Sequence, residues 1–283
     1  MKRGRRWYAV SAGITVVALA IVLWVLLLLA KDGLAGWHWS RLTRFPRELR
    51  SGGGIAPELV NTVSMVMLAE CFSAPVGMAV AVWLTDYAPP AAWVGWLKRV
   101  LIGFQSIPAI VVGLIVYQTL VDGLGWPLSV GSGTIALAVL NLPAVAVLGA
   151  TVLSEVPGRL REGSLALGAT RIQTVWRLML PAALPALIDQ LGYSWARLAG
   201  ETAALIFTAG INVGPRWGWF QPGETLAVHF WYVRTEGAMP DWRMVAAATG
   251  LVLVTITAGA VLGAKLWAAR ILAKRGVGVS ERG

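Results

Sequence analysis

The sequence predicts an all-α membrane protein with six transmembrane helices. Of the 283 residues, 57% are hydrophobic and 13% are charged, which is about half the charged share of a soluble domain. Six apolar stretches are long enough to cross a bilayer, since about 20 helical residues span its hydrocarbon core. Each must be helical because lipid forces every backbone N–H and C=O to pair within its own segment. This composition excludes an ordinary soluble enzyme, a disordered chain and a disulfide-stapled secreted module.

The six stretches are poor in charge and are separated by more polar segments. Pro75 and Pro108 lie inside the second and third stretches, where proline kinks a helix. The first stretch follows basic residues but is about 22 residues long, whereas a removable signal peptide has an apolar run of about 7–15. We therefore expect an uncleaved anchor. In chain order the predicted helices cover residues 9–30, 59–84, 100–121, 134–153, 186–209 and 244–267.

The positive charges predict the orientation of these helices. The net charge is +10, and lysine and arginine accumulate on the cytoplasmic side of membrane proteins. Both termini are therefore expected in the cytoplasm, and we attribute the charge to contact with lipid rather than with nucleic acid. Four arginines form a cluster in the first outer segment: Arg41, Arg44, Arg47 and Arg50. This cluster either binds lipid headgroups or forms a surface that docks an acidic binding protein or attracts anions.

The sequence offers few residues for a cofactor. Cys71 is the single cysteine, and with His38 and His229 it cannot form a Cys/His metal cluster. No lysine follows a glycine, so the GK[ST] step of a Walker A loop is absent. We expect no metal and no cofactor on this chain, and ATP with Mg²⁺ on a partner subunit.

The segment between the fourth and fifth stretches predicts a cytoplasmic helix–turn–helix. Residues 154–185 are more than a bundle connection needs. Pro157 breaks the fourth helix, Gly168 ends a short helix, and a second helical piece over 169–180 is expected to stop at Pro181. In this segment, apolar side chains lie among exposed basic residues. This pattern is typical of a helix that binds in a groove of a partner protein.

This segment resembles the cytoplasmic loop of ABC-importer permeases. That family carries Glu-Ala-Ala, three residues, Gly, nine residues, Ile, one residue and Leu-Pro. The same spacing is kept here by Glu162-Gly163-Ser164, Gly168, Leu178 and Leu180-Pro181. A finer resemblance, to PstA-type phosphate permeases, is carried by GGIAP at 53–57, SIPAIVVG at 106–113, LALGATR at 165–171, LPAALP at 180–185, RLAGETA at 197–203 and LIFTA at 205–209.

The resemblance implies a type I ABC-importer permease (MetI-like) architecture in a bacterial inner membrane. Residues 1–57 would form an anchor helix and an external segment. Residues 58–270 would form the permease core with a coupling loop over 155–185, and residues 271–283 a basic cytoplasmic tail. The coupling residues that it implies are Arg159, Arg161, Glu162, Gly163, Ser164, Gly168, Leu178, Leu180 and Pro181.

The function implied by the resemblance is that of a non-catalytic permease subunit of an ATP-driven importer of inorganic phosphate. The chain would form half of a heterodimeric pathway that works by alternating access. Its implied partners are a PstC-type second permease subunit, two PstB-type ATP-binding subunits and a PstS-type phosphate-binding protein.

Charged residues inside the predicted helices are candidates for the transport path. Arg197 and Glu201 are expected four residues apart on one helical face, and an intramembrane arginine costs several kcal/mol unless it is paired or hydrated. A guanidinium matches phosphate oxygens, and Glu201 would prevent too tight a grip; alternatively, the pair only locks helix packing. The resemblance adds Thr202 to this path. Glu70 would pair with Arg197 or a partner's cation, or be a neutral hydrogen-bonded carboxyl at a helix contact.

Other transport classes stay open. Family members often carry Arg-x-x-Glu near the end of the fourth span, where residues 147–150 read Val-Leu-Gly-Ala, so a permease for sulfate or molybdate is the alternative. An ion-coupled secondary transporter is less favoured, because no internal repeat is visible. A membrane enzyme would need clustered His, Asp or Cys near an interface.

Overall fold

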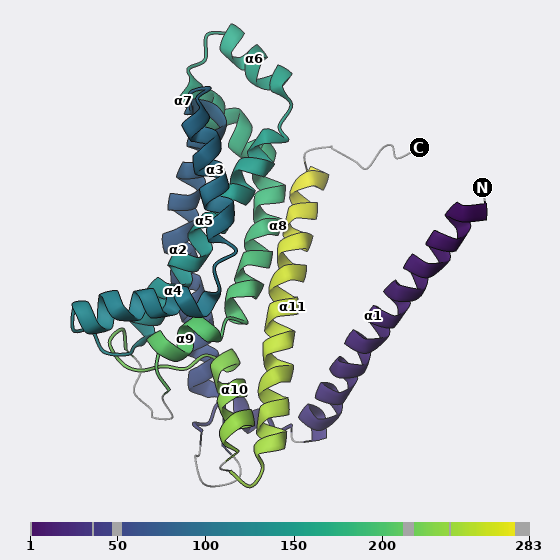
Figure 1. Ribbon diagram of the computed structural model, residues 1–283, viewed down its shortest axis with the longest axis vertical. Coiled ribbons are helices and arrows are strands. Elements are labelled where there is room, and N and C mark those ends of the chain that lie inside the picture. The colour runs from purple at the N-terminus through teal and green to yellow at the C-terminus, as the bar shows by residue number, and fades with distance from the viewer. Residues whose placement is uncertain (1, 36, 47–52, 212–217, 238, 275–283) are drawn as a thin grey trace.

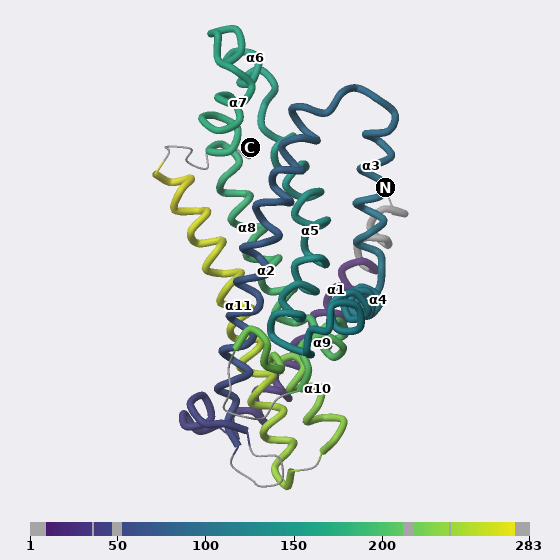
Figure 2. Tube along the Cα trace, turned by 90° about the vertical axis from the view of Figure 1, so that its left-hand side faces the viewer, coloured from purple at the N-terminus to yellow at the C-terminus, as the bar shows by residue number. Residues whose placement is uncertain are grey.

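The computed structural model confirms the predicted all-α fold. It describes residues 2–35, 37–46, 53–211, 218–237 and 239–274, and within these ranges the chain is helical and forms no strand. Figures 1 and 2 show long helices that run roughly along one axis, with short helices near the two ends.

Four long helices make up the body of the molecule. They are α2 (Ala56–Val82), α5 (Val130–Ser154), α8 (Leu180–Ala199) and α11 (Trp242–Lys274). In Figure 1, α8 lies between α5 and α11. This arrangement leaves α5 and α8 at the centre of the molecule.

The apolar core lies where α2, α5 and α8 meet. Met65 of α2, Leu137 of α5 and Leu198 of α8 belong to one buried cluster. The backbones of α2 and α5 approach closely, because a Cβ at Gly77 would lie 2.8 Å from Cβ of Val145. Small residues allow such packing between membrane helices.

Helix α1 (Lys2–Ala35) leans away from the bundle (Figure 1). It touches α11 near its own end, where a Cβ at Gly33 would lie 3.0 Å from the carbonyl oxygen of Ala247. Farther up, Leu23 and Trp24 are 57% and 62% exposed. So large an apolar surface is suited to lipid or to another subunit rather than to water.

The third predicted span is bent rather than straight. Helix α3 (Ala92–Phe104) meets α4 (Ala109–Val116), which η3 (Tyr117–Gly123) extends, at an angle of 96°. Pro108 lacks a backbone N–H and disfavours helical geometry in the preceding residue. The expectation of one helix over 100–121 was therefore wrong. Four described helices are long and apolar enough to cross a membrane, or five with this bent pair as one; six spans are not established.

The fifth predicted helix is also divided. Helix α8 ends at Ala199 and is capped by Gly200, and α9 (Ala203–Thr208) follows as a separate short helix. Glycine has low helix propensity, and the carboxylate of Glu201 bonds to backbone N–H groups that begin α9. The expectation of a single helix over 186–209 was therefore wrong. It was based on mean hydropathy, which does not detect such a break.

The short elements lie near the two ends of the bundle. Helices α6 and α7 are at one end, and α10 is toward the other (Figures 1 and 2). The remaining bounds are η1 (Trp39–Leu42), η2 (Trp83–Tyr87), α6 (Gly158–Ala166), α7 (Arg171–Thr174), η4 (Val175–Met179) and α10 (Leu226–Glu236).

Candidate functional site

A fully buried amide, Asn141 of α5, is the polar centre of the long helices. Its Nδ2 donates a hydrogen bond to Oγ of Ser73 on α2 at 2.9 Å. Its Oδ1 accepts from Oγ of Ser194 at 2.7 Å and from Nη2 of Arg197 at 3.2 Å, both on α8. A buried amide is tolerated when such bonds satisfy it. The bonds therefore fix three helices around one centre.

A cavity of about 430 Å³ lies beside this centre. Asn141, Ser194, Arg197 and Gln190 line it, together with apolar side chains of α2, α5 and α8. The side chain of Arg197 is exposed, and its bond to Asn141 uses one of five guanidinium N–H donors. The cavity can therefore offer a fixed cation and neutral dipoles to an anion.

The carboxyl group of Glu70 faces the same centre from α2. Ser194, Asn141 and Arg197 lie close to it, and its Oε1 is buried without a hydrogen-bond partner. Among the described residues, no carboxylate oxygen lies within 4.0 Å of a guanidinium nitrogen of Arg197. Glu70 and Arg197 thus share one centre without forming a close ion pair.

Glu201 occupies a different place from the one expected. It lies beyond the end of α8, where its Oε1 accepts from the backbone N–H groups of Thr202 at 3.1 Å and Ala204 at 3.4 Å. A carboxylate in this position caps a helix and suits its positive end. Thr202 is half-buried and donates to the carbonyl of Gly200 at 3.4 Å. The expected shared helical face of Arg197 and Glu201 is not present.

The predicted helix–turn–helix, here called the elbow (residues 155–185), is formed by α6, α7, η4 and the start of α8. Gly168 has φ +86°, which glycine adopts without strain, and it separates α6 from α7. Thr170 and Gln173 form a capping box at α7. Oγ of Ser164 lies 3.0 Å from Oγ1 of Thr174. The capping box and the contact between Ser164 and Thr174 therefore stabilise the turn between α6 and α7.

The predicted coupling residues divide into a surface set and a packing set. Arg159, Glu162 and Gly163 are exposed on α6, whereas Leu178 and Leu180 pack against the buried cluster at this end. Pro181 does not stop the second helix. It lies in the first turn of α8, where a missing N–H is tolerated, and the helical run continues from α7 through η4.

Two arginines of the elbow bind the end of the α2 segment. Nη2 of Arg161 lies 2.6 Å from Oδ1 of Asp86 and donates to its backbone carbonyl at 3.2 Å. Nη1 of Arg171 donates to the same carbonyl at 3.2 Å. The side chain of Asp86 is 2% exposed. These bonds connect α6 and α7 to η2, which directly continues the helix that carries Glu70.

The elbow also exposes apolar side chains. Leu167 is 91% exposed, Trp176 65% and Ile172 52%. An apolar patch with basic neighbours is typical of a protein interaction surface.

The outer basic cluster is not a uniform surface. Arg41 is buried, and its Nη2 lies 3.4 Å from Oδ2 of Asp241. It joins η1 to the start of α11, so its expected role in binding headgroups or a docking protein was wrong. Arg44 is exposed, and Arg47 and Arg50 lie outside the described residues.

Sequence reasoning missed three residues of these sites. Asn141 and Ser194 are polar residues within apolar stretches, a pattern that indicates contacts between membrane helices. Asp86 is an acidic residue at the end of an apolar stretch, in a chain whose elbow is basic. These signals mark the residues, but only the fold shows their partners.

Comparisons with known proteins agree with this arrangement. Residues 73–272 match the family model "Binding-protein-dependent transport system inner membrane component". A relative in Bacillus subtilis (strain 168), described as "Probable ABC transporter permease protein YqgI", is 32% identical over 79% of this chain and 80% of its own length. "Phosphate transport system permease protein PstA" of Xylella fastidiosa (strain Temecula1) is 30% identical over 84% of this chain and 82% of its own.

Solved structures share the fold. The inward-facing MetNI methionine ABC transporter contains a chain with a TM-score of 0.64 and 21% identity, covering 77% of this chain and 95% of that one. A bacterial alginate ABC transporter, in complex with an alginate pentasaccharide-bound periplasmic protein, contains one with a TM-score of 0.71 and 15% identity, covering 95% of this chain and 96% of that one.

Proposed function

Because this chain belongs to the family of binding-protein-dependent transport system inner membrane components, we propose that it forms one half of the pathway of an inorganic phosphate importer. Members of the family are non-catalytic, multi-pass inner-membrane permease subunits of ABC importers. They work with a second permease, ATPase subunits and a periplasmic binding protein. The identity of the cargo and of the partners belongs to the proposal.

The observation that carries the phosphate assignment is the setting of Arg197. Its guanidinium is held by a neutral amide, borders a cavity and has no carboxylate within 4.0 Å among the described residues. An arginine in an apolar surrounding needs a counter-charge, and guanidinium binds phosphate oxygens in a fork. The similarity to the PstA relative supports the same cargo.

Glu70 would favour phosphate over sulfate. Phosphate carries a proton at neutral pH and can donate it to a carboxylate, whereas fully ionised sulfate carries none. A carboxylate within electrostatic reach of Arg197 therefore accepts a hydrogen bond from phosphate and repels sulfate. Specificity by repulsion of the competitor is a general device.

We assign the elbow to the ATPase subunits. Its exposed Leu167, Ile172 and Trp176 would fit a groove in one of the two ATPase subunits. The bonds from Arg161 and Arg171 to Asp86 would pass the closure of the ATPases to α2, as a rigid-body step of alternating access. The assigned partners are a PstC-type second permease, two PstB-type ATPases and a PstS-type binding protein.

This assignment places the elbow and both termini in the cytoplasm. The described start of α1 and the described end of α11 both lie in the half of the molecule that carries α6 and α7 (Figure 1). Such an arrangement fits the excess of basic residues at the two termini.

Uptake of labelled phosphate by vesicles containing the reconstituted complex and ATP tests the proposal. Phosphate should accumulate, and unlabelled sulfate and molybdate should compete poorly. Arg197→Gln should lower uptake by up to about a hundredfold, since a hydrogen bond to a charged group contributes up to roughly 3 kcal/mol, while the complex stays assembled.

Arg99→Gln, which removes an exposed arginine of α3, is the matched control and should transport normally. If the complex takes up sulfate or molybdate in preference to phosphate, the proposed cargo is wrong. Normal uptake by Arg197→Gln would remove this arginine from the path.

A further inference from the structure

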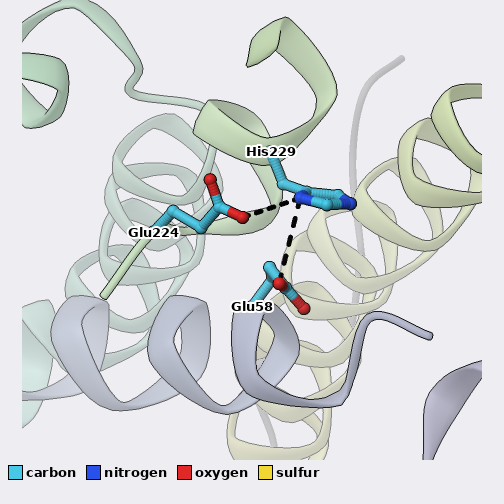
Figure 3. A group of neighbouring side chains, drawn as sticks. All are labelled: Glu58, Glu224 and His229. Atoms are coloured by element: carbon cyan, nitrogen blue, oxygen red, sulfur yellow. Dashed lines mark hydrogen bonds and ion pairs between the residues drawn. The ribbon is translucent and has the colours of Figure 1, made fainter. Parts of the chain in front are cut away.

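Three titratable side chains form a buried cluster far from the elbow (Figure 3). Glu58 lies in the first turn of α2, Glu224 precedes α10, and His229 lies on α10. The exposed fractions of the three side chains are 0% for both glutamates and 2% for the histidine. Nδ1 of His229 lies 2.7 Å from Oε1 of Glu224 and 3.8 Å from Oε1 of Glu58. Figure 3 shows both carboxylates directed toward this nitrogen.

The polar atoms of this cluster are poorly satisfied. Neither carboxylate oxygen of Glu58 has a hydrogen-bond donor among the described residues, and Oε2 of Glu224 and Nε2 of His229 also lack a partner there. Within the described part of the chain, no lysine or arginine lies within 4.0 Å of either carboxylate. Because buried polar atoms without a partner are unfavourable, this cluster has unused capacity to bind a ligand.

We propose that this cluster binds a divalent transition-metal cation, with Glu58, Glu224 and Nδ1 of His229 as its protein ligands. One ligand atom from each residue lies within 4.8 Å of the other two, so small side-chain rotations bring them around one ion. Two carboxylates, a neutral imidazole and a divalent cation sum to zero charge. Imidazole with carboxylate suits Zn²⁺, whereas Mg²⁺ and Ca²⁺ prefer oxygen ligands alone.

The backbone around the cluster is held in place. Nδ2 of Asn61 donates to the carbonyl of Glu224 at 3.1 Å, and the N–H of Leu226 donates to Oγ1 of Thr62 at 2.8 Å. These bonds tie the start of α2 to the start of α10 independently of the cluster itself. The ligands are therefore positioned before a metal arrives, as a metal site with high affinity requires.

Nδ1 of His229 must carry no proton when it binds a metal. Bound metal would join α2 to α10 and stabilise this end of the molecule.

Zinc titration of the purified full-length chain tests the site. The chain carries Cys71→Ser, which removes an exposed thiol, and is stripped with EDTA before equilibration with micromolar free Zn²⁺. Elemental analysis should find about one zinc per chain. Glu58→Gln and His229→Gln should each weaken zinc binding at least about tenfold.

Matched controls come from the same chain. Glu236→Gln removes an exposed carboxylate of α10, and His38→Gln removes an exposed histidine; both should bind zinc as the parent does. X-ray absorption at the zinc edge of the parent should show nitrogen and oxygen ligands and no sulfur, a readout that does not depend on a variant's folding. A parent chain without zinc, or unchanged binding by His229→Gln, would overturn the proposal and leave a proton-sharing cluster.

Discussion

Arg197 and Glu58 are both ionisable residues among apolar helices, but the groups that surround them differ. Arg197 is held by the neutral oxygen of Asn141 and borders a cavity, so its charge is available to a cargo that comes and goes. Glu58 is buried with His229 at a helix junction, and both of its carboxylate oxygens lack a hydrogen-bond partner among the described residues, so a permanently bound cation would satisfy it. The two settings suit a transport site and a structural site, respectively.

Replacing Asn141 should destabilise the helix contacts around it. Asn141→Leu leaves Ser73, Ser194 and Arg197 without their shared partner, and an unsatisfied buried polar group costs about 1–3 kcal/mol. Thermal unfolding of the purified chain should show this loss, and phosphate uptake should fall with it. Val139→Leu changes an exposed side chain of the same helix and should stay within about 0.5 kcal/mol of the parent. Equal stability of the two variants would contradict the role of the amide.

Removing the charge of Glu70 should relax the choice of anion. Glu70→Gln keeps the shape of the side chain but no longer repels sulfate, so the preference for phosphate over sulfate should fall about tenfold, the ratio that roughly 1.4 kcal/mol gives. Competition of unlabelled sulfate against labelled phosphate uptake measures this ratio. Glu162→Gln, an exposed glutamate of the elbow, should leave it unchanged. An unaltered ratio in Glu70→Gln would place the carboxylate outside the selective step.

At the scale of helices, the connection between the elbow and α2 is made by a few bonds. Asp86 receives an ion pair from Arg161 and a second bond from Arg171, and α2 carries Ser73, which bonds to Asn141. A displaced elbow therefore pulls on a helix that contacts the cavity centre. Packed helices that slide or rotate as units transmit such movements.

Breaking this connection should separate ATP hydrolysis from transport. Asp86→Asn removes the ion pair but keeps the backbone carbonyl that both arginines bind, so the complex should assemble and hydrolyse ATP. Phosphate transported per ATP hydrolysed should fall about tenfold, within the 0.5–2 kcal/mol typical of coupling residues. Asp122→Asn, at an exposed position in η3, serves as the control. Equal losses of hydrolysis and uptake would point to faulty assembly instead.

The sequence predicted helices better where they are long and uninterrupted than where they break. The second, fourth and sixth apolar stretches lie within α2 with η2, α5 and α11, because hydropathy is sufficient to identify uninterrupted apolar helices. The third and fifth were placed wrongly at Pro108 and Gly200, where local backbone chemistry ends a helix inside apolar sequence.

The candidate sites were predictable only in part. The spacing of the elbow is local and visible in the sequence. The bonds of Asn141 to Ser73 and Ser194, and the meeting of Glu58 with His229, join segments far apart in the chain. Such contacts depend on how the helices pack, which hydropathy does not encode.

At the scale of the whole molecule, two exposed features indicate what surrounds the chain. Helix α1 leans away from the bundle with an exposed apolar surface (Figure 1), and the side chain of Arg197 is exposed at the cavity. An exposed guanidinium cannot face lipid without a large free-energy penalty. We therefore expect another subunit to supply the missing wall of the cavity.

The chain on its own should not transport phosphate. In vesicles that contain only this chain, neither ATP nor a proton or sodium gradient should drive uptake, because half of the pathway and the ATPases are absent. Adding the second permease and the ATPases should restore ATP-dependent uptake, which labelled phosphate measures against protein-free vesicles. Gradient-driven uptake by the chain alone would instead favour a secondary transporter. The open cavity would then have to close between two copies of this chain, which the mass of the protein in detergent would show.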